Sequence, residues 1–168
     1  MKIHKISILM LMSLLMANCD SDDDSSNEVP QIDLKAEFIL FSVEPSTQFA
    51  GTATITGIVK NIGDDFNSGA GQQTISLYER SLGTPTNQSG NLVASLNFET
   101  LAANETLEVS YSRPWNSSSP AEGEFPPEYI LVISYDPDLF LDGNLNNDDT
   151  NTANNEILVS GSLINNMF

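Results

Sequence analysis

Short runs of strand-forming residues alternate with turn-forming clusters along most of this chain. From residue 33 onward, runs rich in Val, Ile, Thr, Phe and Tyr are separated by clusters of Gly, Pro, Asn and Asp. No stretch repeats its apolar residues at a helical period. The pattern is typical of an all-β protein. The expected strands lie at 33–43, 52–61, 72–80, 91–99, 105–112, 128–136 and 155–162.

The alternation inside these runs predicts how the strands pack. In the second run, Ala53, Ile55 and Val59 share one face and threonines lie on the other, which indicates a sheet with one buried face. Residues 129–133 are apolar on both faces, so their strand should be central. Short antiparallel strands bury their apolar faces when two sheets pack together. We therefore expect an immunoglobulin- or fibronectin-III-like, two-sheet antiparallel sandwich of about seven strands, formed by residues 32–163, with a C-terminal tail at 164–168.

The N-terminus has the order of a secretory signal. A short basic start is followed by the apolar residues 6–16, about half of the roughly 20 residues that a membrane-spanning helix needs. We expect a signal peptide at 1–18, directly before the only cysteine, Cys19. This arrangement resembles a bacterial lipoprotein signal, in which the cysteine is acylated, although Asn18 departs from the small residues usual before it. The alternative is an ordinary signal peptide followed by a free cysteine.

Residues 19–31 are rich in Asp, Ser and Asn and are expected to form a flexible acidic tether. Within them, residues 21–25 resemble the acidic surface-export signal of Bacteroidetes lipoproteins, and a simple solvated linker is the alternative. The resemblance implies an exported outer-membrane lipoprotein that faces the cell exterior.

Charge and missing residue types narrow the possible functions. The sequence has a formal net charge of −17, and removal of residues 1–18 leaves four basic against 23 acidic residues. Such a chain is a poor partner for nucleic acid. Its only histidine, His4, lies in the signal, so histidine-based catalysis and zinc binding are excluded from the mature chain. We expect no enzymatic activity.

The densest group of oxygen ligands lies between the last two expected strands. Its Asp and Asn residues recur at every second position around Gly143, as in loops that bind Ca²⁺. The loop lacks a bidentate Glu, and a solvated turn needs the same residue types. The candidate calcium ligands are Asp136, Asp138, Asp142, Asn144, Asn146, Asp148 and Asp149.

Trp115, the only tryptophan, lies in a segment expected to form a loop over 112–128. Its ring could stack on a sugar. The alternative, which is commoner for such a residue, is that the ring closes one end of the core with its N–H bonded to the backbone.

Short motifs follow one another along the expected domain: Asp33-Leu34, Val59-Lys60-Asn61-Ile62-Gly63, Leu77-Tyr78-Glu79, the 101–106 segment, Tyr135-Asp136-Pro137-Asp138 and Asn154-Asn155. Together these motifs resemble the CARDB family, the cell adhesion related domain found in bacteria. The resemblance covers about residues 33–161 and implies an extracellular sandwich used as an adhesion or spacer module. Two features depart from the family: the 151–155 segment lacks the usual Glu, and two loops are longer.

Together these observations predict a lipid-anchored, non-enzymatic surface module that acts in adhesion, matrix contact or scaffolding. The expected partners are the membrane, through the N-terminal lipid, and an unidentified surface protein or glycan. The alternative is a calcium-assisted glycan-binding lipoprotein that uses Trp115 and the acidic loop. A carboxylate-pair hydrolase is disfavoured, because no acidic pair lies in a recognisable apolar pocket.

Overall fold

The computed structural model describes residues 28–168. The expected signal peptide, Cys19 and most of the expected tether lie outside the described residues. Among residues 28–168, no helix is long and apolar enough to span a bilayer.

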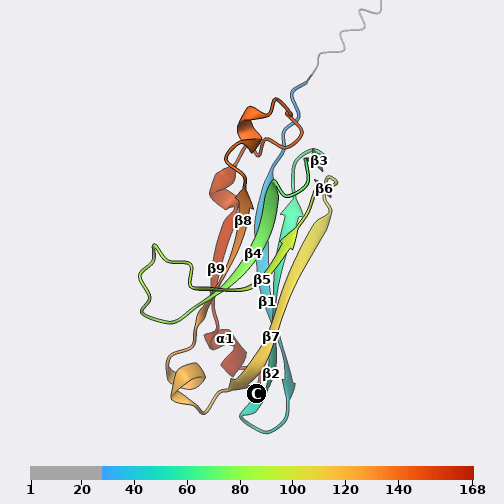
Figure 1. The fold of residues 1–168 in the computed structure, drawn as a ribbon. Coiled ribbons are helices and arrows are strands. Elements are labelled where there is room, and N and C mark those ends of the chain that lie inside the picture. The colour runs from blue at the N-terminus through green and yellow to red at the C-terminus, as the bar shows by residue number, and fades with distance from the viewer. Residues whose placement is uncertain (1–27) are drawn as a thin grey trace, which may run out of the picture.

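Two antiparallel sheets face each other in the described domain (Figure 1). One sheet has the order β1-β2-β7 and the other β5-β4-β8-β9. The expected all-β, two-sheet sandwich is confirmed, and each expected strand is present. The strands of the first sheet are β1 (Leu34–Pro45), β2 (Ala50–Asn61) and β7 (Thr106–Asn116), and those of the second are β4 (Gln73–Arg80), β5 (Asn91–Asn97), β8 (Glu128–Tyr135) and β9 (Glu156–Ser160).

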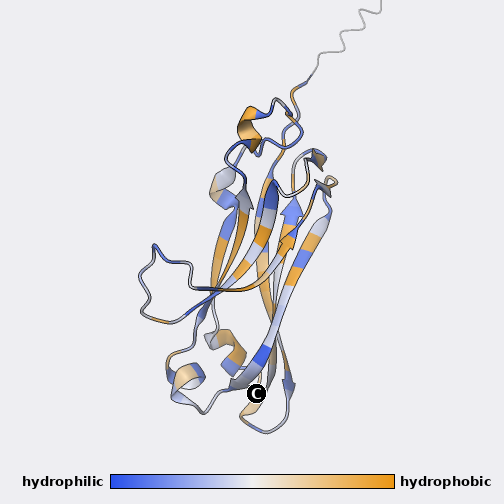
Figure 2. Ribbon diagram, in the orientation of Figure 1, coloured by the Kyte–Doolittle hydropathy of each residue, from blue (hydrophilic) through white to orange (hydrophobic). Residues whose placement is uncertain are grey.

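The core lies between these sheets, where β1 packs against β8 and β9, and β7 against β4 and β5. Hydrophobic and polar residues alternate along the strands (Figure 2). Ala53, Ile55 and Val59 are fully buried, as their alternation with threonine predicted. The strand β8 lies between β4 and β9, so the prediction of a central strand at 129–133 is confirmed. Gly57 completes the inner face of β2, because a side chain there would collide with Leu131 of the opposite sheet.

Short elements that the sequence did not predict close the ends of the sandwich. Two-residue strands pair as a small third sheet and place Phe66 and Leu101 in the core, and the Phe66 ring packs on that of Phe98 with centroids 5.4 Å apart. The short elements are β3 (Phe66–Asn67), β6 (Thr100–Leu101), the π-helical turn η1 (Pro120–Glu124), the 3₁₀ turns η2 (Leu139–Leu141) and η3 (Thr152–Asn154), and the helix α1 (Ser162–Asn165).

Two expected boundaries were wrong. The strand β7 continues to Asn116, so Trp115 lies in a strand and not in a loop. This strand pairs only with β2, and Pro114 is tolerated there because an edge strand has one unpaired side. The expected tail is part of the packed domain, since Ile164 is fully buried in the core and Phe168 packs against it.

Residues of the CARDB-like motifs have structural roles near the entry of the chain. The buried Asn61 side chain donates to the carbonyls of Leu101 and Asp64, at 2.8 and 2.6 Å. A side chain at Gly63 would collide with the backbone of Gln31. The Asn154 side chain donates to Asp33 at 2.8 Å. The contacts at Gly63 and Asn154 involve the first residues of the domain, and those of Asn61 join the end of β2 to β6.

Candidate functional site: the two polar ends of the sandwich

Polar residues gather at both ends of the sandwich. We call the end where residues 28–33 enter the N-terminal end; it also carries η2 and the loop at 136–155 (Figure 1). The distal end carries the β1–β2 turn, η1 and α1. The 12-residue strand β1 runs from one end to the other, which at 3.3 Å per residue corresponds to about 40 Å.

The candidate calcium loop at the N-terminal end is closed by its own hydrogen bonds. The Asp142 carboxylate accepts from the Asn144 N–H at 2.7 Å, and from the side chains of Asn147 at 2.9 Å and Gln72 at 3.4 Å. These bonds, with that from Asn147 the strongest, lower the pKa of Asp142 below its ordinary value. Both oxygens of this carboxylate thus accept hydrogen bonds from within the protein.

The spacing of Asp and Asn in this loop also has a local structural explanation. Asp136, Asp142, Asn144 and Asp149 each accept, through a side-chain oxygen, the backbone N–H two residues further on. These are Asx turns, and successive turns of this kind also place Asp and Asn at every second position.

Asp149 is 7% exposed and joins the loop to the core. Its carboxylate accepts from the Tyr135 hydroxyl at 2.8 Å and from the Asn155 side chain at 2.9 Å. Burial, together with the charge of Asp149, raises the pKa of Tyr135 well above its ordinary value. Asp149 therefore has a structural role, because it links the loop to β8 and to the residue that precedes β9.

The acidic side chains of this loop do not form a metal-binding group by themselves. Within residues 28–168, no three or more Asp, Glu, His or Cys side chains are grouped so as to hold a metal ion. Four buried oxygens in this region, on Asn147, Asp148, Asn154 and Asn155, have no hydrogen-bond donor among the described residues. Proteins usually provide ordered water for buried acceptors of this kind. The hydrogen bonds of the loop are those of a structured turn, and the calcium site stays a prediction.

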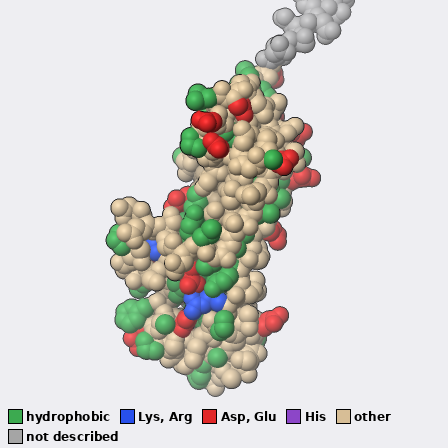
Figure 3. Space-filling view, viewed as in Figure 1, with side chains coloured by type: hydrophobic (Ala, Val, Ile, Leu, Met, Phe, Trp, Pro, Cys, Tyr) green, Lys and Arg blue, Asp and Glu red, His purple; other side chains and the backbone are tan. Residues whose placement is uncertain are grey.

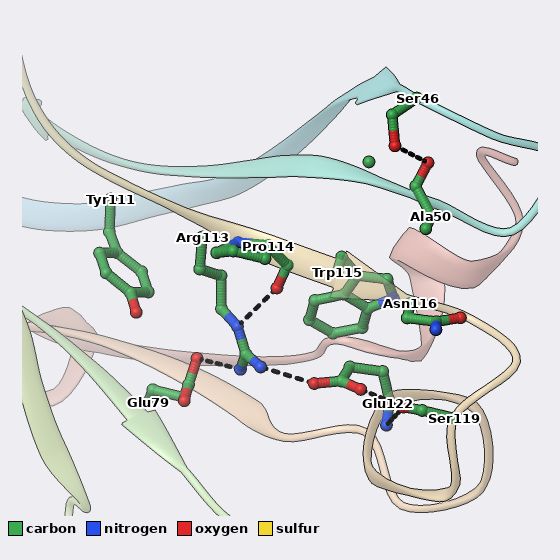
Figure 4. A pocket seen from close by; sticks show the side chains of 11 residues that line it. Ser46, Ala50, Glu79, Tyr111, Arg113, Pro114, Trp115, Asn116, Ser119 and Glu122 are labelled. Atoms are coloured by element: carbon green, nitrogen blue, oxygen red, sulfur yellow. Dashed lines mark hydrogen bonds and ion pairs between the residues drawn. The ribbon is translucent and has the colours of Figure 1, made fainter.

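The distal end holds an ion cluster in an open cleft (Figure 4). Arg113, on the inner face of β7, donates to Glu79 of β4 at 2.8 Å and to Glu122 of η1 at 2.6 Å. Tyr129 of β8 donates its hydroxyl to the same oxygen of Glu79, Oε2, at 2.9 Å. The cluster thus joins both sheets and η1.

Burial and charge shift two groups of this cluster. Burial opposes the charge of Arg113, but hydrogen bonding and attraction to Glu79, with a further contribution from Glu122, raise its pKa above the ordinary value. Burial, followed by the charge of Glu79, raises the pKa of Tyr129 well above its ordinary value. Both groups therefore keep their protons at neutral pH, as donors to Glu79.

The cleft around Arg113 has a volume of about 740 Å³. Its walls include Tyr111, Trp115 and Glu122, and Gly51 of β2 also lines it. Figure 3 shows basic and acidic side chains together on the lower part of one face, with hydrophobic side chains beside them. A smaller hollow adjoins the cleft and shares Glu79, Arg113 and Glu122 with it. The exposed Phe125 and Leu82 line this hollow.

Trp115 closes the distal end of the core, which is one of the two roles expected for it. It is 2% exposed, and its indole N–H donates to the Asn165 side chain at 2.8 Å and not to the backbone. A ring this buried has no open face on which a sugar could stack. The Arg113 guanidinium lies 5.4 Å from the ring centroid, within the range of a cation–π contact.

Sequence reasoning missed Arg113, Glu79, Glu122 and Tyr129 as a group. One signal was present in the expected strand 72–80, where Ile75 and Leu77 predict an inward face and Glu79 is the next residue on it. A charged residue at an inward position needs a partner, because an unpaired buried charge is costly. The partner itself comes from segments distant in the sequence.

Comparisons with known proteins give no family for this chain. No family model matches it, and no curated protein matches it. Two solved structures show weak likeness to it: β-glucosidase 3B from Thermotoga neapolitana in complex with glucose, and a β-glucosidase from Kluyveromyces marxianus in complex with glucose. The first is 15% identical with a TM-score of 0.32, and the second 17% identical with a TM-score of 0.29.

Each match covers 78% of this chain but only 17% or 15% of the matched β-glucosidase. Likeness at these TM-scores supports no conclusion about function.

Proposed function

We propose that this protein is a lipid-anchored, non-enzymatic module of the outer membrane that faces the cell exterior and acts in adhesion, matrix contact or scaffolding. The observation that carries the proposal is the separation of the two ends. The chain enters the sandwich at the N-terminal end, and the open cleft lies at the distal end, about 40 Å of strand away. A lipid at Cys19 would leave the distal end free to meet a partner.

The chemistry of the chain agrees with a non-enzymatic role. The mature sequence has neither histidine nor a second cysteine. Glu79 and Glu122 face the cleft, but both are ion-paired with one guanidinium. Neither lies in an apolar pocket of the kind that keeps a proton on a catalytic carboxyl group. Membership of the CARDB family is part of the proposal, supported by the structural roles of Asn61, Gly63 and Asn154.

Protease treatment of intact cells tests this function. The wild-type protein should be lost from intact cells, and it should incorporate a radiolabelled fatty acid. Cys19→Ala should lose both the label and the surface location while keeping the same fold, because the substitution lies outside the described domain. Wild-type protein that resists protease on intact cells, or that carries no lipid, would contradict the proposal.

A further inference from the structure

The distal cleft contains hydrogen-bonding groups that the protein does not use fully. Each terminal nitrogen of Arg113 makes one bond, to Glu79 or Glu122, although each carries two N–H groups. Glu79 accepts both of its bonds through Oε2, and its Oε1 has no donor among the described residues. The Tyr111 hydroxyl, which points toward this cluster in Figure 4, also has no partner among them.

These groups are held in fixed positions. Arg113 donates its Nε to the Pro114 carbonyl at 3.2 Å, in addition to its two carboxylate partners. Glu122 is fixed in turn by Ser119, whose hydroxyl donates to it at the start of η1. A ligand therefore meets donors and an acceptor that are already ordered, which lowers the entropic cost of binding.

The charge of the cleft limits what it can bind. One guanidinium faces two carboxylates, in a chain with a net charge of −17, so anionic ligands are repelled. A cation would use the carboxylates but not the remaining N–H groups of Arg113. A hydroxyl group both donates and accepts, and it can use Glu79 Oε1, Tyr111 and Arg113 together.

Apolar surface beside these polar groups suits a sugar ring. Phe125 is 60% exposed and Leu82 is 54% exposed, and both line the hollow that adjoins the cleft. Aromatic rings offer an apolar face next to polar groups. The volume of about 740 Å³ lies within the roughly 300–1,000 Å³ typical of small-molecule sites.

We propose that the distal cleft binds a segment of a neutral glycan, without calcium. Sugar hydroxyl groups bond to Glu79, Arg113 and Tyr111, and a ring face packs on Phe125. The inference deepens the proposed function, because it supplies the partner class that a surface module would contact. Its test is made on purified protein, so its failure would leave the surface location untouched.

The only tryptophan of the chain lines this cleft and serves as the reporter. Full-length protein, purified in a zwitterionic detergent without a sugar headgroup, is titrated with neutral tetrasaccharides of glucose, mannose and xylose. At least one should produce a saturable change in tryptophan fluorescence, and the change should persist in EDTA. No saturable change with any of the three, or a change abolished by EDTA, would overturn the proposal.

Two variants separate binding from folding. Tyr111→Phe removes one hydroxyl that has no partner in the domain, so it should weaken binding about fivefold and leave the melting temperature unchanged. Glu79→Gln keeps the shape of the side chain and should weaken binding by a similar factor or more. The control is Glu128→Gln, which alters the Arg80–Glu128 ion pair outside the cleft and should leave binding unchanged.

Unchanged affinity in both Tyr111→Phe and Glu79→Gln would place any sugar elsewhere and contradict the proposal. Tighter binding of a lysine-rich peptide than of every tetrasaccharide would contradict it as well, because the cleft would then act as a cation site.

Discussion

The two ends of this sandwich are both polar, and they differ in how their polar groups are used. At the N-terminal end, Asp142 and Asp149 each accept three hydrogen bonds from their own surroundings. At the distal end, Glu79 keeps one oxygen open to the cleft, and Arg113 keeps N–H groups that make no bond. Four buried side-chain oxygens of the N-terminal end also lack a donor among the described residues. The incomplete groups of the distal end differ from them in lining an open cleft, where a ligand can reach them.

The largest effect is expected from Asp149→Ala at the N-terminal end. This change leaves the Tyr135 hydroxyl and the Asn155 amide without their acceptor in a mostly buried region. Unsatisfied buried donors cost about 1–3 kcal/mol each, so the free energy of unfolding should fall by about 3 kcal/mol. Urea denaturation measures it. Asp138→Ala, an exposed residue of the same loop, is the control and should change stability by less than about 0.5 kcal/mol. Equal losses of stability in the two variants would mean that Asp149 does not have this structural role.

Arg113→Met at the distal end should cost less, about 2 kcal/mol. It leaves Glu79 and Glu122 close together without their shared partner, and the cost is below that of a fully buried pair because the side chains are 12–22% exposed. Urea denaturation measures the free energy of unfolding of this variant. The control is Lys60→Met, which removes a positive charge on the outer face of β2. A variant as stable as the wild type would show that the cluster does not hold η1 in place.

Alkaline pH should lower the stability of the fold through one tyrosine at each end. The pKa of Tyr129 is raised by folding, so the folded state keeps a proton that the unfolded chain releases above about pH 10. Stability is therefore fully present below pH 10 and falls above it, by up to about 1.4 kcal/mol per pH unit for this group. The same direction holds for Tyr135 at the N-terminal end. Denaturation between pH 8 and 11 should show a smaller loss in Tyr129→Phe; an identical pH profile would contradict the burial of this hydroxyl.

The smallest effect is expected from calcium. The oxygens of Asp142 and Asn144 already accept hydrogen bonds, so millimolar Ca²⁺ and EDTA should give melting temperatures within about 1 °C of each other. A bound ion at 100 times its dissociation constant would add about 2.7 kcal/mol, or several degrees. A shift of that size, lost in Asp142→Asn, would contradict this expectation and support the predicted calcium site.

The strands could be predicted because alternation of polar and apolar residues is local. The end of β7 could not, since Pro114 signals a loop unless the strand lies at an edge, which is a property of the assembled sheet. The cleft was missed for a similar reason, because Glu79, Arg113 and Glu122 come from three separate segments. The Asp and Asn spacing was correctly noticed, but Asx turns and calcium loops share it.

Hydrogen–deuterium exchange compares the two ends in one experiment. Full-length protein is labelled alone, with Ca²⁺, and with the tetrasaccharide that changes tryptophan fluorescence most. We predict that the sugar slows exchange in segments around Glu79 and residues 111–125, and that Ca²⁺ leaves exchange over 136–149 unchanged. The opposite result would contradict the assignment of the ligand site to the distal cleft. In that result, Ca²⁺ slows exchange over 136–149 and the sugar leaves exchange at the distal end unchanged.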